Sequence, residues 1–497
     1  MKKILWGILI VVILLSALEL SLRAVFVVFH WAPSGLTPEK SITQNKLWQQ
    51  QLFSNFLGVQ QSDPYLLWKF KPRLNKHIFV TNSQGTLGPE YKTKKSPGTF
   101  RILLLGDSSP VGLGLPDRRY AFGEQFERLL TENLSNQKFE LINAAVSGYT
   151  SAQGLLWFRK YGVKLKPDLV LIYFGNNDAS YNGYIEDKEL LSRLVWMVSL
   201  QEFLSNFALY RTLRGILLPL KEKLLNTADS QPKRLKVRVS AEDYYHNIED
   251  IVRLARQSGG KVMLMTVPVP RQWPPAIEFK PFVNLQTKAG QPVMAEESRN
   301  TLSQEMAYCL DWSEIKQKYP QIDYWTLNVL RQVYADTGNL DSSIQSHQQK
   351  LDAGKDTVVD LNNLAVLYWR KQDYLKSLQY ITQALALDSA NAILHYNLGM
   401  LAKKMGDSLS ASGEFEKAKE LDFYSLRTKK AYNDKLKSLA QQQKISLVDL
   451  DSIFLANHNE FLFIDHCHPK PEGHRLMAEA LLEKFRPTGW MDALNKN

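Results

Sequence analysis

The chain has 497 residues, more than one ordinary core holds, so we expect two domains or one domain with a long insertion. Hydrophobic residues make up 44% and charged residues 22% of the chain, a balance that excludes wholesale disorder. The net charge of +11 favours anionic surroundings such as lipid headgroups or acidic polysaccharide. The basic residues are scattered and form no nucleic-acid motif, so we expect no nucleic-acid partner, and a solvated basic surface is the simpler interpretation of the charge.

The N-terminus combines two lysines with a long apolar run. The run covers residues 4–29 and is interrupted by Glu19 and Arg23, which would pair on one face of a helix. As a helix it is about 39 Å long, enough to cross a bilayer. A cleaved signal peptide is the alternative, but no convincing cleavage site follows. We therefore expect residues 1–30 to be an uncleaved signal anchor, a single transmembrane helix in the inner membrane of a bacterium. The catalytic domain would then lie on the periplasmic, extracytoplasmic side.

Five short apolar runs indicate a parallel sheet. Helical stretches such as 122–133 and 152–161 lie between the first of them. Fully apolar strands that alternate with helices predict a five-stranded parallel sheet covered on both faces, an α/β domain of flavodoxin-like three-layer architecture. Such a sheet places its ligand site at the carboxyl ends of its strands. The runs are 100–105, 139–142, 169–174, 262–267 and 445–450.

A first stretch, 184–225, interrupts this alternation. It is rich in Leu, Trp and Phe with spaced Lys and Arg, which predicts amphipathic helices. These helices would form a lid over the site, lie on the membrane, or simply pack onto the domain.

A second interruption contains a repeat. Leu330, Leu364 and Leu398 are 34 residues apart, and other small and large residues follow the same spacing. The pattern resembles the tetratricopeptide helix-turn-helix unit, with a good match over 362–422 and a weak one over 328–361. It predicts a short all-α array over about 328–422, docked on the catalytic domain. Its role would be to bind a protein partner or to act as a structural spacer.

Polar residues follow the first three predicted strands. Ser108 comes directly after the first strand, at a turn that would expose its hydroxyl at the carboxyl edge of the sheet. Gly148 offers a backbone N–H and Asn177 a side-chain amide, which together with the N–H of Ser108 can hold a developing oxyanion. Each alone has a structural explanation, as a helix cap or a turn residue.

Near the C-terminus, Asp465 and His468 are three residues apart in a predicted loop. The carboxylate can accept from Nδ1 of the imidazole, which leaves Nε2 to take a proton from serine. The alternative is a helix cap beside an unrelated histidine. His466 and His474 are competing bases without so well placed a carboxylate. Cys467 stands between two histidines, but no further cluster completes a ligand set, so we predict no metal and no other cofactor.

Taken in order, these segments resemble the sequence blocks of the SGNH (GDSL-type) hydrolase superfamily. The segments 82–90 and 468–474 are also similar to those of membrane-anchored bacterial members. The resemblance covers about 70–270 and 424–487. It implies that Ser108 is the nucleophile, that Gly148 and Asn177 are oxyanion donors, and that His468 is a base oriented by Asp465. The matching blocks are Gly106-Asp107-Ser108, Gly148, Gly175-Asn176-Asn177-Asp178 and Asp465-His466-Cys467-His468.

We therefore predict a serine esterase that acts on an ester-linked acyl group, such as O-acetyl on an envelope or extracellular glycan. An O-acyltransferase of cell-envelope polysaccharide would use the same residues. A catalytically lapsed scaffold that binds partners through the repeats is the third hypothesis. The two cysteines, Cys309 and Cys467, either form one disulfide or are free thiols. The predicted domain order is 1–30 anchor, 31–98 juxtamembrane stalk and domain edge, 99–270 first hydrolase part, 271–423 helical insertion and 424–497 second hydrolase part.

Overall fold

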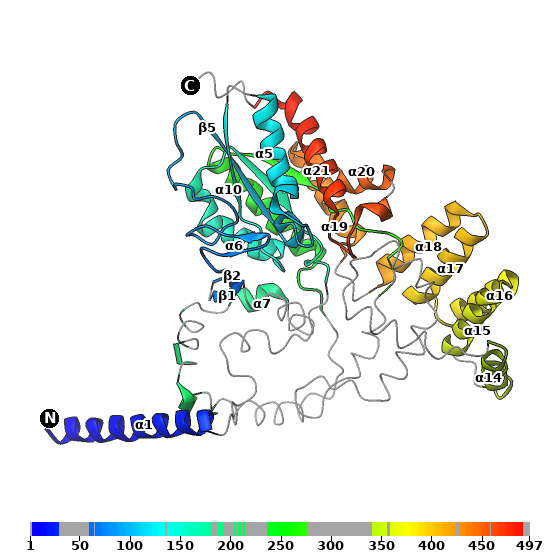
Figure 1. Cartoon of the computed structure of the whole chain (residues 1–497), viewed down its shortest axis with the longest axis horizontal. Helices are drawn as coiled ribbons and strands as arrows, with labels where there is room; N and C mark the ends of the chain where they lie inside the picture. Colours follow the sequence, from blue (N-terminus) through cyan, green and yellow to red (C-terminus); the bar gives the residue numbers. More distant parts are fainter. Residues whose placement is uncertain are drawn as a thin grey trace. The chain divides into compact units, whose positions relative to one another are not determined.

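The structure is a computed structural model of the whole chain (Figure 1). It describes residues 2–28, 59–63, 65–134, 137–180, 186–192, 196, 200, 203–204, 207–210, 212–213, 236–273, 275, 340–354, 358–422, 427–457 and 459–490. Two compact units are present. The first unit is Met1–Lys71, Asn182–Lys236 and Thr287–Pro292, and the second is Pro72–Tyr181, Val237–Gln286 and Val293–Asn497.

The first unit contains the helix α1 (Lys2–Val28). Glu19 pairs with Arg23 at 2.7 Å, as the sequence predicts, and its carboxylate also accepts the backbone N–H groups of Ala208 and Leu209 at 2.8 Å. Within the parts of the chain that the structure describes, no helix is both long enough and apolar enough to cross a membrane. The predicted transmembrane helix in residues 1–30 is therefore not supported. The charged pair breaks the apolar run, and its carboxylate bonds to another segment of this unit.

The second unit is built on a five-stranded parallel sheet, as predicted. Its strand order is β6-β5-β7-β8-β9. Every residue of β5 and β7 is buried, which explains why these strands are mainly apolar; Arg101 of β5 is buried with its guanidinium bonded to Glu140. The last strand joins the sheet after the long insertion, with Leu447 beside Leu264 of β8. The bounds are β5 Thr99–Gly106, β6 Lys138–Asn143, β7 Leu169–Tyr173, β8 Lys261–Met265 and β9 Ser446–Val448.

Helices cover both faces of this sheet (Figure 1). On one face, α5 (Phe122–Asn133) packs against α21 (Pro471–Phe485). On the other, α10 (Ala241–Gln257) packs against both α6 (Ser151–Lys160) and α19 (Lys430–Gln443). The predicted three-layer α/β/α arrangement is thereby confirmed.

The first unit also contains the short elements β1 Gln60–Asp63, β2 Leu67–Phe70 and α7 Asp187–Leu191. Most of the predicted helical stretch 184–225 lies outside the described residues. The smaller elements of the second unit are β3 Asn75–Lys76, β4 Phe79–Val80, α4 Ser108–Val111, α20 Leu450–Ala456, and the 3-10 helices η1 Arg118–Tyr120, η2 Gly162–Leu165, η5 Asn459–Leu462 and η6 Arg486–Thr488.

Five helices of the second unit form the predicted repeat region, in which each helix packs against the next. Asp373 and Asp407 each begin a helix by accepting the N–H of the residue three positions later, so the 34-residue spacing has a structural counterpart. Gly399 permits close packing, because a Cβ there would lie 2.9 Å from the ring of Phe415. The helices are α14 Leu340–Asp352, α15 Val358–Arg370, α16 Tyr374–Leu387, α17 Ala392–Lys404 and α18 Ser408–Leu421.

The last repeat helices share a core with the sheet. Tyr396 of α17 and Phe415 of α18 belong to the same buried apolar cluster as Met265 of β8 and Trp273. At its edge, Arg271 bonds Glu416 of α18 at 3.0 Å. The repeat region is thus joined to the sheet by apolar packing as well as by the chain.

Candidate active site

Ser108 lies where the central strand β5 ends. The chain turns sharply there, and a Cβ at position 106 would lie 2.5 Å from Pro110 and 2.8 Å from the carbonyl of Tyr173, so only glycine fits. Asp107 then begins the short helix α4 by accepting the N–H of Ser109 at 3.0 Å. This turn leaves Ser108 as the first residue of α4, at the carboxyl edge of the sheet.

A chain of hydrogen bonds joins Ser108 to His468 and Asp465. The Ser108 Oγ lies 2.8 Å from His468 Nε2, and His468 Nδ1 lies 2.7 Å from Asp465 Oδ2. Because an ionised carboxylate only accepts, Nδ1 carries a proton, and in neutral His468 this leaves Nε2 to accept from the serine hydroxyl. The structure therefore brings together all three residues of the predicted serine, histidine and aspartate set.

The loop before α21 holds this carboxylate firmly. Asp465 Oδ1 accepts the backbone N–H groups of Cys467 at 2.9 Å and His468 at 2.8 Å. Ile464 donates its N–H to the carbonyl of His468 at 2.8 Å, which closes the loop. The orientation of the imidazole is thus fixed by backbone and side chain together.

The charges of this site stabilise one another. Burial alone would raise the pKa of Asp465, but the neighbouring His468 and His466 outweigh it and lower that pKa. Burial would lower the pKa of His468, but the Asp465 carboxylate outweighs it and raises that pKa well above the usual range. Next to Ser108, burial raises the pKa of the Asp107 carboxyl to about 6.

The predicted oxyanion donors follow the two strands beside β5. Gly148 has a φ of +85°, which favours glycine, and lies in the loop after β6. Asn177 lies after β7, and its Nδ2 donates to the carbonyl of Tyr149 at 3.1 Å. Asp178 accepts the N–H of Ser151 at 2.9 Å. The two loops are therefore bonded to each other beside Ser108.

The competing histidines have other surroundings. His474 is fully buried, and its Nδ1 accepts the N–H of Phe122 at the start of α5, at 3.2 Å. Burial lowers the pKa of His474 to about 3, so this ring is neutral and caps a helix. His466 contacts the ring of Trp273, with centroids 6.0 Å apart. Cys467 is a buried thiol with its Sγ 3.6 Å from His468 Nδ1, and Cys309 lies outside the described residues.

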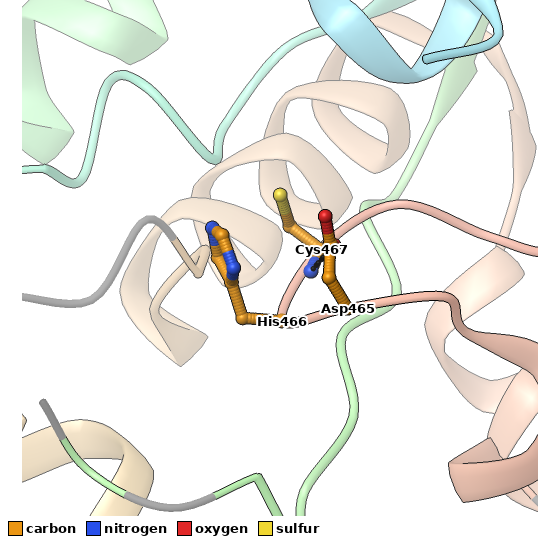
Figure 2. A group of neighbouring side chains, drawn as sticks. All are labelled: Asp465, His466 and Cys467. Atoms are coloured by element: carbon orange, nitrogen blue, oxygen red, sulfur yellow. Dashed lines mark hydrogen bonds between the residues drawn. The ribbon is translucent and has the colours of Figure 1, made fainter. Parts of the chain in front are cut away.

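Figure 2 shows Asp465, His466 and Cys467, whose possible metal-ligand atoms lie within 4.8 Å of one another. The carboxylate of Asp465, however, already accepts three N–H donors, two from the backbone and one from His468. A metal ion at this carboxylate would compete with His468 for the same negative charge. The donor geometry therefore fits the partner of a histidine better than a metal ligand.

Two buried groups near the oxyanion loops were missed by sequence reasoning. Arg238 is fully buried and donates to the carbonyl of Gly148 at 2.7 Å and to Gln153 Oε1 at 3.1 Å. Thr428 donates its backbone N–H to Asn176 Oδ1 at 3.0 Å. Both approach from segments far away in the sequence, and no local pattern marks them.

A three-layer fold with a hydrogen-bonded serine, histidine and aspartate at the edge of its sheet defines the class of this protein as an α/β ester hydrolase. The model of the GDSL-like lipase/acylhydrolase family matches residues 104–296. Residues 104–296 are thus similar to this family, and the model of a tetratricopeptide repeat matches residues 361–391. Both family resemblances expected from the sequence are thereby confirmed.

Solved structures similar to this chain include TesA, an acetylxylan esterase and a GDSL-like lipase. TesA is 22% identical, with a TM-score of 0.21, and the match covers 34% of this chain and 62% of TesA. An acetylxylan esterase from Geobacillus stearothermophilus is 12% identical, with a TM-score of 0.31, and the match covers 78% of this chain and 95% of the esterase. A GDSL-like lipase from Bacteroides thetaiotaomicron is 12% identical, with a TM-score of 0.29 and coverage of 80% and 88%. The search of curated proteins gave no match.

Proposed function

We propose that this protein is a serine esterase that cleaves an ester-linked acyl group through an acyl-serine intermediate. The observation that carries the proposal is the hydrogen-bond chain from Ser108 Oγ through both nitrogens of His468 to Asp465. A serine hydroxyl is a weak nucleophile until a neighbouring base takes its proton, and this geometry supplies that base.

The reaction has two halves. In the first, His468 Nε2 takes the proton of Ser108 while Oγ attacks the ester carbonyl, and the same nitrogen then gives the proton to the departing alcohol. The oxyanion sits among the N–H groups of Ser108 and Gly148 and the amide of Asn177. In the second, a water attacks the acyl-serine, its proton passes through His468 back to Ser108, and the free acid leaves.

For the substrate, we propose an O-acylated glycan, such as an O-acetylated envelope or extracellular polysaccharide. The net charge of +11 favours anionic polymers. The lysines and apolar run at the N-terminus favour an exported protein, so we place the reaction outside the cytoplasm. A protein partner bound to the tetratricopeptide repeat would direct the enzyme to its site of action.

A fluorophosphonate probe, which reacts with activated serines, tests the nucleophile. We expect the wild-type chain to be labelled and the Ser108→Ala variant not to be. Ser109→Ala is the matched control, because Ser109 is a buried neighbour whose Oγ contacts the carbonyl of Cys467 at 3.4 Å, and it should be labelled like the wild type. A folded wild-type chain that is not labelled would contradict the proposal and favour a scaffold that acts through its repeats.

An assay on acetylated polysaccharide tests whether water or a second glycan accepts the acyl group. An esterase releases acetate, whereas an O-acyltransferase passes the acetyl group to a second glycan with no acetate released. Both reactions use the same acyl-serine, so probe labelling does not distinguish them. We expect the wild-type chain to release acetate and the Ser108→Ala variant not to. Acetylation of an acceptor glycan with no release of acetate would assign the transferase instead.

A further inference from the structure

The segment that begins at Arg427, after the last repeat helix in the sequence, contacts the loop that carries Asn177. Thr428 donates its backbone N–H to Asn176 Oδ1 at 3.0 Å, and both residues are almost completely buried. Gly175 has a φ of +154°, and a Cβ there would lie 2.7 Å from Thr428 Oγ1. The loop and the returning chain are thus in tight contact immediately beside the predicted oxyanion donor.

We name the three consecutive residues Arg427, Thr428 and Lys429 the junction segment. Arg427 bonds Asp422, the residue that ends α18, at 2.9 Å. Lys429 Nζ donates to the carbonyls of Asp422, at 2.6 Å, and Lys419, which lie at the C-terminal end of α18. The positive end of Lys429 therefore caps this helix, where a cation is favourable.

The same segment is fixed to the hydrolase fold. Arg427 has 1% of its side chain exposed and donates to the carbonyls of Pro270, at 3.2 Å, and Trp273, at 3.0 Å. Burial lowers the pKa of Lys429 to about 8, as expected for an ammonium group enclosed between two elements. A buried guanidinium with three partners leaves little freedom to this part of the chain. Movement of the end of α18 would consequently displace Thr428 and with it Asn176.

We propose that Asn176 is a positioning residue, through which the junction segment and the end of α18 hold the amide of Asn177 in its oxyanion-binding place. The proposal rests on the proposed function, since it concerns the same oxyanion. It makes the last repeat helix a determinant of the rate of acyl transfer.

The size of the effect follows from the role of the amide. Loss of an oxyanion donor lowers kcat by on the order of 10²–10³, and this sets the upper limit, reached in Asn177→Ala. Asn176→Ala keeps that amide but removes its support, so we expect kcat to fall by roughly 10-fold to 100-fold. KM should change little, because the oxyanion forms only in the transition state.

Steady-state hydrolysis of p-nitrophenyl acetate by the full chain measures this split. Asn176→Asp keeps an acceptor oxygen for the Thr428 N–H and should restore most of the lost kcat. Asn397→Ala is the matched control, because this buried asparagine of α17 bonds Asn362 within the repeats at 2.8 Å and does not touch the junction segment. Asn397→Ala should lower the melting temperature but leave kcat at the wild-type value. Equal kcat in Asn176→Ala and the wild type would overturn the proposal, as would an equal loss in Asn397→Ala.

A double-mutant cycle tests the route through α18. Asp422→Asn weakens the bond to Arg427 at the end of that helix and should lower kcat in the wild-type background. In the Asn176→Ala background the link to the loop is already gone, so Asp422→Asn should have little further effect on kcat. The same fold-loss in both backgrounds would refute the coupling.

The two proposals fail in different ways. A folded wild-type chain that neither reacts with the fluorophosphonate probe nor hydrolyses the ester contradicts the proposed function. A wild-type chain that does both, with Asn176→Ala equally active, contradicts only the coupling.

Discussion

At the scale of single residues, Asp465 sets the pH at which His468 can accept a proton. Only neutral His468 is a base, and the carboxylate raises the pKa of His468 well above its usual range. Protonation at low pH therefore removes the base, and activity is lost as the pH falls through that raised pKa. We expect the acid limb of kcat/KM to lie above about pH 6.5, the ordinary value for histidine.

Asp465→Asn should shift this limb to lower pH, because the amide no longer stabilises the imidazolium. It should also lower the maximum rate by several orders of magnitude, since the amide no longer selects the tautomer. Rates of ester hydrolysis from about pH 5 to about pH 9 measure both effects. His246→Gln, on the exposed face of α10, should leave the profile unchanged. Superimposable acid limbs in wild type and Asp465→Asn would show that another group controls the profile.

At the scale of elements, a buried arginine supports the loop that begins α6. Arg238 donates to the carbonyl of Gly148 and to Gln153, whose side-chain oxygen also accepts the N–H of Thr150 in a capping box. Arg238→Met keeps the length of the side chain but leaves the Gly148 carbonyl without this donor. An unsatisfied buried acceptor costs about 1–3 kcal/mol. We expect the free energy of unfolding, measured in urea, to fall by this amount. The fluorophosphonate probe should also label Ser108 more slowly.

Arg159 provides the comparison for this prediction. It lies on α6 itself, but its side chain is 48% exposed and its pair with Asp250 is on the surface. Arg159→Met should cost well under about 1 kcal/mol, as exposed pairs do, and should not slow labelling. An equal loss of unfolding free energy in Arg238→Met and Arg159→Met would show that the loss does not depend on the burial of Arg238.

The elements themselves were largely predictable, because their signals are local. β5 and β7 are fully buried and mainly apolar, with Thr99 and Arg101 of β5 as the polar exceptions, and the predicted runs agree with them closely. Ser108 and Asn177 were found because polar residues at the ends of such strands stand out. Arg238 and Thr428 could not be found this way. Each bonds a residue about 90 or more positions away, and a single hydrogen bond leaves no periodicity in the sequence.

At the scale of the whole molecule, segments that are far apart in the sequence pack into one apolar core. The 34-residue spacing predicts the repeats, and the structure contains them. Nothing in the spacing predicts that Phe415 and Tyr396 share an apolar cluster with Met265 of the sheet. Ile381 of α16 lies instead in a separate cluster formed by α15, α16 and α17. Periodicity shows which face of a helix is apolar, but not against which element that face packs.

These two clusters predict different consequences for stability. Phe415→Ala removes a ring from the core shared with the sheet and should cost about 3–5 kcal/mol. Because that core supports the hydrolase fold, labelling of Ser108 by the fluorophosphonate probe should end at a lower urea concentration than in the wild type. Ile381→Ala empties a buried position of the separate repeat cluster and should lower helical ellipticity at moderate urea while labelling persists to the wild-type midpoint. If Phe415→Ala left the labelling midpoint unchanged, α18 would be an attachment to the hydrolase fold and not a part of its core.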